Sequence, residues 1–176
     1  MVVSTQDTTV MHTVTASTYQ LGRAHARDHL GMKTAARKLH YKRKFRNLDI
    51  SVENRKGSNR YWHDPHTGKK GKTKQAYPYG YIRMTKGMDG DHVDCYVGPN
   101  ENASHVYIIL TNKAPTFESP DEQKCMLGFD SADEAEAVFK AHFDDPRFFR
   151  SMTVMPYEAF ETRVLNTLHS RNKQLT

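Results

Sequence analysis

Three carboxylates gather in one short segment of the sequence, at Asp89, Asp91 and Asp94. Carboxylates this close repel one another unless a cation neutralises them or water solvates them fully in a loop. Oxygen ligands suit a hard cation such as Mg²⁺ or Mn²⁺ better than Zn²⁺. A cation of this kind lowers the pKa of a bound water and makes hydroxide available near neutral pH. The segment therefore predicts metal-assisted chemistry on an anionic, phosphorylated substrate.

The alternative for this segment is a polar hairpin that contains glycine, and the triplet Asp-Gly-Asp does not by itself distinguish the two. In an extended stretch Asp89 and Asp91 point the same way, and Gly90 permits backbone conformations that other residues resist. Strand-like residues flank the segment at 79–84 and 93–97. We expect these two strands to hold the acidic loop between them.

The residues around the loop add a more specific pattern. It comprises Glu53–Ser58, Tyr79–Ile82, the acidic run Asp89–Asp94, the pair Gly98–Pro99 and the segment Asp121–Phe129. Tyr79–Ile82, the acidic run and the apolar strand after it resemble the signature of soluble inorganic pyrophosphatases. More closely, the whole set, within residues 53–160, resembles the pyrophosphatase-like domain of bacteriophage proteins. The resemblance implies an α+β fold: a small, closed or nearly closed OB-like β-barrel with helices packed outside it. It also implies a phage-encoded protein that acts in the host cytoplasm or is carried in the virion.

The resemblance assigns roles to individual acidic residues. Asp89 and Asp94 would hold the metal, and Asp91 would help to activate the attacking water as well as contacting the metal. A later acidic-x-Lys element matches Glu122 and Lys124, as a further metal ligand and a phosphate-contacting lysine. The acid a few residues earlier would be Glu118, with Asp121 as the competing choice.

Other positions follow from the same comparison. Tyr79 would contact phosphate. Glu53 matches an acidic metal ligand on an early strand, and Arg60 matches the basic residue that follows it. One of the lysines at 70, 72 or 74 would replace a phosphate-binding arginine. The implied reaction is in-line attack of metal-activated water on pyrophosphate, or on another phosphorylated small molecule, with Mg²⁺ or Mn²⁺ as cofactor.

The sequence departs from the family pattern at two places. His92 stands where the family usually has proline. The Tyr-Lys pair that grips phosphate from the helix after the barrel has no match, and the local sequence there is His142-Phe143-Asp144. Loss of a lysine and gain of a carboxylate should weaken binding of a highly charged anion. Metal binding is therefore better supported by the sequence than turnover of pyrophosphate.

The remaining sequence suggests an arm and a domain. Residues 1–46 form a tail and a basic, amphipathic helical arm, and residues 47–170 form the pyrophosphatase-like domain. Helices are expected at 131–143, with capping-box spacing at Ser131 and Glu134, and at 157–168 after Pro156. The 26 Lys and Arg exceed the 20 Asp and Glu, and many of them lie at 33–46. That stretch is either a solvated face or a site for nucleic acid or for phage structural subunits.

The sequence disfavours a secreted, a membrane-spanning or a disulfide-bonded protein. The start of the chain lacks the pattern of a signal peptide, and no apolar run approaches the length of a membrane span. Cys95 and Cys125 lie in apolar sequence and are expected to be buried, reduced thiols. Three readings stay open: a phosphohydrolase, a non-catalytic phage virion or accessory protein that reuses the barrel, and a nucleic-acid-binding module. We also expect a homo-oligomer.

Overall fold

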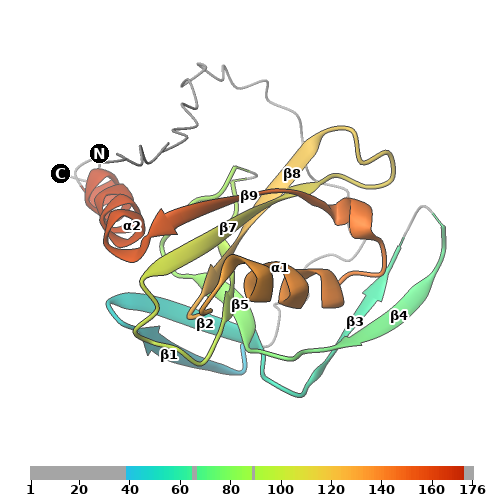
Figure 1. Ribbon diagram of the computed structural model, residues 1–176, viewed down its shortest axis with the longest axis horizontal. Coiled ribbons are helices and arrows are strands. Elements are labelled where there is room, and N and C mark those ends of the chain that lie inside the picture. Colours follow the sequence, from blue (N-terminus) through green and yellow to red (C-terminus); the bar gives the residue numbers. More distant parts are fainter. Residues whose placement is uncertain (1–38, 65–66, 89, 173–176) are drawn as a thin grey trace, which may run out of the picture.

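The computed structural model describes residues 39–64, 67–88 and 90–172, and these contain nine strands, two α-helices and a short 3₁₀ helix (Figure 1). The strands are β1 (Tyr41–Phe45), β2 (Leu48–Asn54), β3 (Asn59–His63), β4 (Lys70–Lys74), β5 (Tyr79–Ile82), β6 (Asp94–Val97), β7 (His105–Asn112), β8 (Pro120–Leu127) and β9 (Phe149–Pro156). The helices are α1 (Ala132–Ala141), η1 (Pro146–Phe148) and α2 (Tyr157–Asn172).

Seven strands form one sheet in the order β1-β2-β5-β6-β8-β7-β9, and β3 pairs only with β4 in a separate hairpin. All neighbours in the large sheet are antiparallel except β6 and β8, which are parallel. Residues 41–45, which the sequence assigned to a helical arm, are strand β1. Their charge suits an edge strand, because charged side chains discourage the unpaired backbone groups of an edge from pairing with another strand. The rest of the predicted arm, at 1–38, lies outside the described residues.

The predicted closed barrel is wrong for the described part of the chain. Among the described residues, the sheet ends at β1 and β9, and these two strands do not pair with each other. Closure would need hydrogen bonds between the first and last strands. Both edges instead carry mostly exposed side chains, and β1 presents Lys42 and Lys44 to solvent. Charged edge strands resist further pairing, so the sheet stays open. The broader prediction of a β-sheet with two C-terminal helices is confirmed.

Side chains alternate along each strand, so the sheet buries two separate apolar clusters. One cluster contains Ile50, Cys95 and Cys125 together with Tyr157 and Phe160 of α2. The two thiols are free and buried, as predicted, and burial raises the pKa of Cys125 to about 12. The opposite cluster packs against α1 and contains the residues Tyr79, Tyr96, Tyr107, Ile109, Met126, Phe129, Ala135 and Phe139. The face of the sheet covered by α1 therefore carries most of the buried tyrosines.

Both helices begin where the sequence predicts. The Glu134 N–H donates to the Ser131 hydroxyl at 3.1 Å, and Glu134 Oε2 accepts from the Asp130 N–H at 2.9 Å. This is a capping arrangement that satisfies two backbone donors at the start of α1. α2 follows Pro156 directly. Among the described residues, no helix has the length and apolar character needed to cross a bilayer.

Candidate active site

Three adjacent strands bring the predicted polar residues to one place on the α1 face of the sheet. Asp94 on β6 and Lys124 on β8 are partners in the parallel register. On the other side of β6, strand β5 places Tyr79 opposite Tyr96. β5 lies unusually close to β2, since a Cβ at Gly80 would meet Ser51 O at 1.9 Å. Only glycine permits this approach, and the approach fixes the position of Tyr79.

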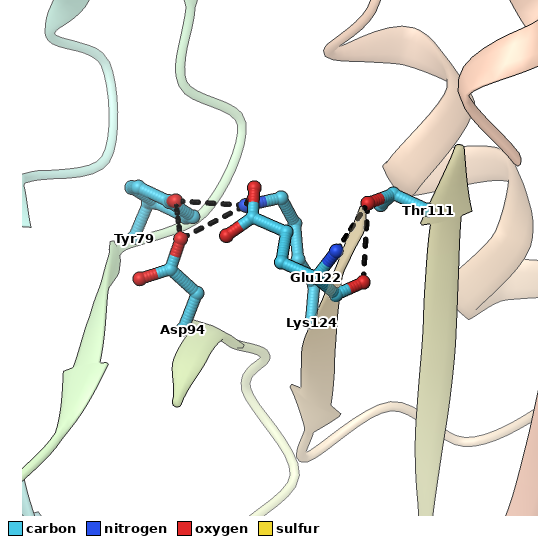
Figure 2. A network of polar contacts seen from close by, with 5 residues as sticks. All are labelled: Tyr79, Asp94, Thr111, Glu122 and Lys124. Atoms are coloured by element: carbon cyan, nitrogen blue, oxygen red, sulfur yellow. Dashed lines mark hydrogen bonds and ion pairs between the residues drawn. The ribbon is translucent and has the colours of Figure 1, made fainter. Parts of the chain in front are cut away.

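Lys124 is the centre of the resulting cluster (Figure 2). Its Nζ lies 2.8 Å from Asp94 Oδ2, 2.7 Å from Glu122 Oε1 and 3.1 Å from Tyr79 Oη. The Tyr79 hydroxyl in turn donates to Asp94 Oδ2. An ammonium group has three N–H donors, and here three oxygens surround it. The side chain of Lys124 is only 2% exposed, so this cation is held inside the protein by its partners.

Glu122 joins the cluster because side chains point to alternate faces along β8. Residues 122 and 124 are two apart on one strand and therefore project from the same face. The backbone at Glu122 is anchored by Thr111, whose Oγ1 accepts from the Glu122 N–H at 3.2 Å and donates to the Glu122 C=O at 3.1 Å (Figure 2). This double contact lies where the pairing of β7 with β8 shifts, and it holds the Glu122 backbone in place.

The charges in this cluster depend on one another. Burial pushes the pKa of Asp94 upward, but Lys124 and the Tyr79 hydroxyl bring it below its usual value. Burial raises the pKa of Glu122 above its usual value, even with Lys124 beside it. Burial lowers the pKa of Lys124, yet Asp94, Tyr79 and Glu122 more than compensate and raise it well above normal. Lys124 is therefore protonated at any physiological pH, and Asp94 is ionised.

A second cation reaches the cluster from the β3–β4 hairpin. The Arg60 guanidinium carbon lies 5.0 Å from the centroid of the Tyr79 ring, and Lys124 Nζ lies 5.3 Å from the same centroid. Burial raises the pKa of Tyr79 well above its usual value, so its hydroxyl keeps its proton. Two cations, two carboxylates and a neutral phenol thus form one site. Such a set can bind an anion through the cations and a metal through the carboxylates.

A model of the family described as Inorganic Pyrophosphatase matches residues 32–165. The chain belongs to the inorganic pyrophosphatase family. The match spans most of the chain and includes every member of the Lys124 cluster, so the family resemblance inferred from the sequence is confirmed. No curated protein matches the chain.

The family site residues predicted from the sequence do not all meet in one place. The structure brings together Tyr79, Arg60, Asp94, Glu122 and Lys124. Glu53 lies on β2 where its register with β5 shifts, between the pairs Val52–Gly80 and Asn54–Tyr79. Asp89 lies outside the described residues.

The other two predicted family acids lie on the surface. Asp91 is exposed in the loop before β6, where its backbone C=O accepts from the Gly87 N–H at 2.7 Å. Glu118 is exposed in the connection before β8, and its C=O accepts from Arg150 at 3.2 Å. Neither carboxylate is among the partners of Lys124 within the described part of the chain. Their roles in a metal site stay predictions.

The hairpin lysines that were expected to replace a phosphate-binding arginine, at 70, 72 and 74, face away from the cluster. In the antiparallel register Arg60 is opposite Thr73, whereas Lys72 is opposite Tyr61. Paired residues share a face and adjacent residues do not. Since Arg60 faces Tyr79, the lysines at 70, 72 and 74 lie on the other side of the hairpin and are exposed. They do not take the place of a phosphate-binding arginine in this arrangement.

Two members of the site were not predicted from sequence. Tyr96 follows Asp94 by two residues on β6, and that spacing alone could have placed it on the same face. Its hydroxyl is fully buried without a hydrogen-bond partner in the described structure. His142 packs beside it, with ring centroids 4.9 Å apart. The Ala76 N–H donates to His142 Nε2 at 3.2 Å, and Nδ1 lies 2.6 Å from Val138 O, which it reaches as a donor.

The donor set fits a hard divalent cation only in part. Asp94 and Glu122 converge on the same ammonium and offer oxygen ligands of the type that Mg²⁺ and Mn²⁺ prefer. No group of three acidic, histidine or cysteine side chains is arranged to hold a metal ion in the ranges that the structure describes. A metal site that used Asp94 and Glu122 would need at least one further carboxylate beside them.

Proposed function

We propose that the protein is a divalent-metal-dependent phosphohydrolase that cleaves pyrophosphate at the Lys124 cluster. The observation that carries the proposal is that the buried Lys124 ammonium contacts Asp94, Glu122 and Tyr79 inside the region matched by the pyrophosphatase family. Burial of a lysine between two carboxylates is costly unless every group is paired. A protein retains such a cluster most readily where it has a use for the concentrated charge.

The carboxylates are assigned to metal binding. Asp94 and Glu122 would hold Mg²⁺ or Mn²⁺, with the third carboxylate drawn from Asp89, Asp91, Glu53 or Glu118. A bound metal would acidify a water molecule and neutralise phosphate oxygens. Asp91, exposed at the loop that leads into β6, is assigned as the base that accepts the proton of the attacking water.

The cations and the phenol are assigned to the substrate. Lys124 and Arg60 would bind phosphate oxygens and oppose the negative charge that grows on the leaving phosphate. Tyr79 stays protonated because burial raises its pKa, so its O–H can donate to a phosphate oxygen. Water oxygen forms a bond to one phosphorus, the bridging P–O bond breaks, and its electron pair leaves with the second phosphate. No covalent intermediate on the protein is needed.

One observation favours a second candidate function. Lys124 already pairs with both carboxylates, and three oxygens surround its ammonium. A cluster satisfied internally in this way can be purely structural. The alternative is therefore a non-catalytic phage virion or accessory protein that retains the family fold and docks through its basic residues on DNA or neighbouring subunits.

Release of phosphate from pyrophosphate in the presence of Mg²⁺ or Mn²⁺ separates the two functions. The wild type is compared with Asp91→Asn and Asp94→Asn, and with Asp49→Asn as a matched control, since Asp49 is an exposed carboxylate on β2. The enzyme predicts metal-dependent release that the first two variants reduce by at least about 100-fold, on the scale of losing an electrostatic contact to the transition state. The control should keep full activity. Absence of release by the wild type with either metal would favour the structural alternative.

A further inference from the structure

The β3–β4 hairpin has two chemically different faces. Register pairs share a face, so Arg60 and Thr73 lie on the same side as Trp62 and Gly71. This is called the inner face. The outer face consists of Asn59, Tyr61, His63, Lys70, Lys72 and Lys74, and all six are exposed. The hairpin forms its own two-stranded sheet and extends to one side of the molecule (Figure 1).

Contacts of the inner face fix the direction in which the outer face points. Arg60 lies over the Tyr79 ring at 5.0 Å. The Trp62 ring covers Gly71 so closely that a Cβ there would lie 2.4 Å from Trp62 Cζ2. The Trp62 contact packs the two strands of the hairpin together, and the Arg60 contact turns the inner face toward the Lys124 cluster. The outer face therefore points away from the candidate active site, and the proposed phosphohydrolase reaction does not account for it.

The outer face is strongly basic. It carries three ammonium groups and no carboxylate. None of the three lysines has an ion pair with any residue that the structure describes. They alternate along β4, so neighbouring lysines are about 6.8 Å apart along an antiparallel strand. A row of cations at this spacing fits a row of phosphates along an extended chain better than it fits one small anion.

Aromatic rings stand beside the row of lysines. Tyr61 lies directly opposite Lys72 and is 76% exposed, although a large ring normally finds a partner to pack on. His63 lies two residues further on the same face, opposite Lys70. Aromatic rings interleaved with cations are the arrangement on which unpaired bases stack while the backbone phosphates contact the cations. Bases in a duplex are already stacked and do not offer a free face.

We propose that the outer face binds single-stranded nucleic acid. The three lysines contact successive phosphates, and Tyr61 stacks on a base, with His63 beside it. The site is a second, non-catalytic one, and its ligand is a polymer rather than the pyrophosphate assigned to the Lys124 cluster.

The test measures the fluorescence anisotropy of a labelled single-stranded oligothymidylate titrated with the full chain, over a range of salt concentrations and with divalent metal chelated. Wild type is compared with Tyr61→Ala and with the triple variant Lys70→Gln, Lys72→Gln, Lys74→Gln. A matched triple variant, Lys140→Gln, Arg147→Gln, Arg150→Gln, removes the same charge from exposed positions outside both the hairpin and the basic stretch at 33–46. Because no pyrophosphate and no free metal are present, the result does not depend on catalysis.

The proposal predicts that the wild type binds the single strand and that Tyr61→Ala weakens binding at least about fivefold, as expected for loss of one stacked base. The hairpin triple variant should reduce the slope of log affinity against log salt by about 2, from three lost contacts to a single strand. Equal weakening by the matched triple variant, equal affinity for a duplex of the same length, or no effect of Tyr61→Ala would overturn it. The last result would leave only a general attraction for polyanions. Circular dichroism of each variant checks that the fold is intact.

Discussion

Asp94 and Lys124 face each other across the single parallel pairing of the described sheet, with Lys124 Nζ 2.8 Å from Asp94 Oδ2. The two residues are 30 positions apart in sequence, and the link depends on β8 lying beside β6 rather than only beside β7. The strand order therefore creates the cluster. Anything that alters this pairing should alter both stability and the proposed chemistry.

Replacement of Lys124 should destabilise the fold strongly. Lys124→Met leaves the carboxylates of Asp94 and Glu122 together without their cation. Removing one member of a buried ion pair typically costs about 3–5 kcal/mol. Urea denaturation should show this loss, whereas Lys140→Met, which breaks an exposed pair with Glu136 on α1, should change the free energy of unfolding by less than about 1 kcal/mol. Similar small effects for both variants would mean that the cluster does not stabilise the fold.

Tyr96 should tolerate loss of its hydroxyl. The group is buried without a hydrogen-bond partner in the described structure, so Tyr96→Phe removes an unsatisfied polar atom. We expect the free energy of unfolding to stay the same or to rise by about 1 kcal/mol. By contrast, Tyr79→Phe removes contacts to both Lys124 and Asp94 and should destabilise the protein by about 1–3 kcal/mol. Thermal and urea unfolding measure both. A clear loss of stability in Tyr96→Phe would show that its hydroxyl has a partner in solution.

His142 should make stability sensitive to mild acid. Burial lowers its pKa below the ordinary value of 6.5, and its neutral form accepts from the Ala76 N–H. The unfolded chain therefore binds a proton first, and stability rises with pH through this range. The contribution of His142 is complete above about pH 6.5 and is lost as pH falls toward its lower folded value.

The measurement is urea unfolding at a series of pH values for wild type and His142→Gln. His142→Gln should flatten the fall in stability below about pH 6.5. Parallel curves for wild type and His142→Gln would contradict the burial of a neutral imidazole.

Gly80 should not accept a side chain. A Cβ at this position would lie 1.9 Å from Ser51 O on β2, a backbone atom that cannot move without disturbing the sheet. Gly80→Ala should therefore cost more than about 4 kcal/mol, beyond the range of ordinary substitutions. Gly57→Ala provides a control, since a Cβ there meets nothing within 4 Å and suffers only from the positive φ of 82°. Denaturation midpoints compare the two, and a cost for Gly80→Ala no greater than the control would contradict the close approach of β2 and β5.

The family resemblance assigned Glu122 and Lys124 to the site, and the structure places them on one face because they are two residues apart on a strand. The capping pattern at Ser131 predicted the start of a helix, and that prediction is confirmed. The sequence did not predict that the sheet stays open or that basic residues 41–45 form an edge strand. Both depend on which distant strands pair, and alternation within one segment does not specify the partner.

The missed residues have a similar explanation. Tyr96 and His142 meet only because α1 packs on the face of the sheet that carries Asp94. The acidic loop was the most conspicuous feature of the sequence, yet of its two described aspartates Asp94 belongs to the cluster and Asp91 lies on the surface. Clusters of like charge are conspicuous in a sequence, whereas a site assembled from single residues on several strands is not.

The central claim is that Asp94 and Glu122 hold a divalent metal beside Lys124. It is tested most directly by a crystal structure of the protein with Mn²⁺ and a non-hydrolysable pyrophosphate analogue, using anomalous scattering to locate the metal. We predict a manganese peak coordinated by the Asp94 and Glu122 carboxylates, with the analogue contacting Lys124 or Arg60. Manganese bound at other side chains only, with Lys124 still enclosed by Asp94, Glu122 and Tyr79, would contradict the account.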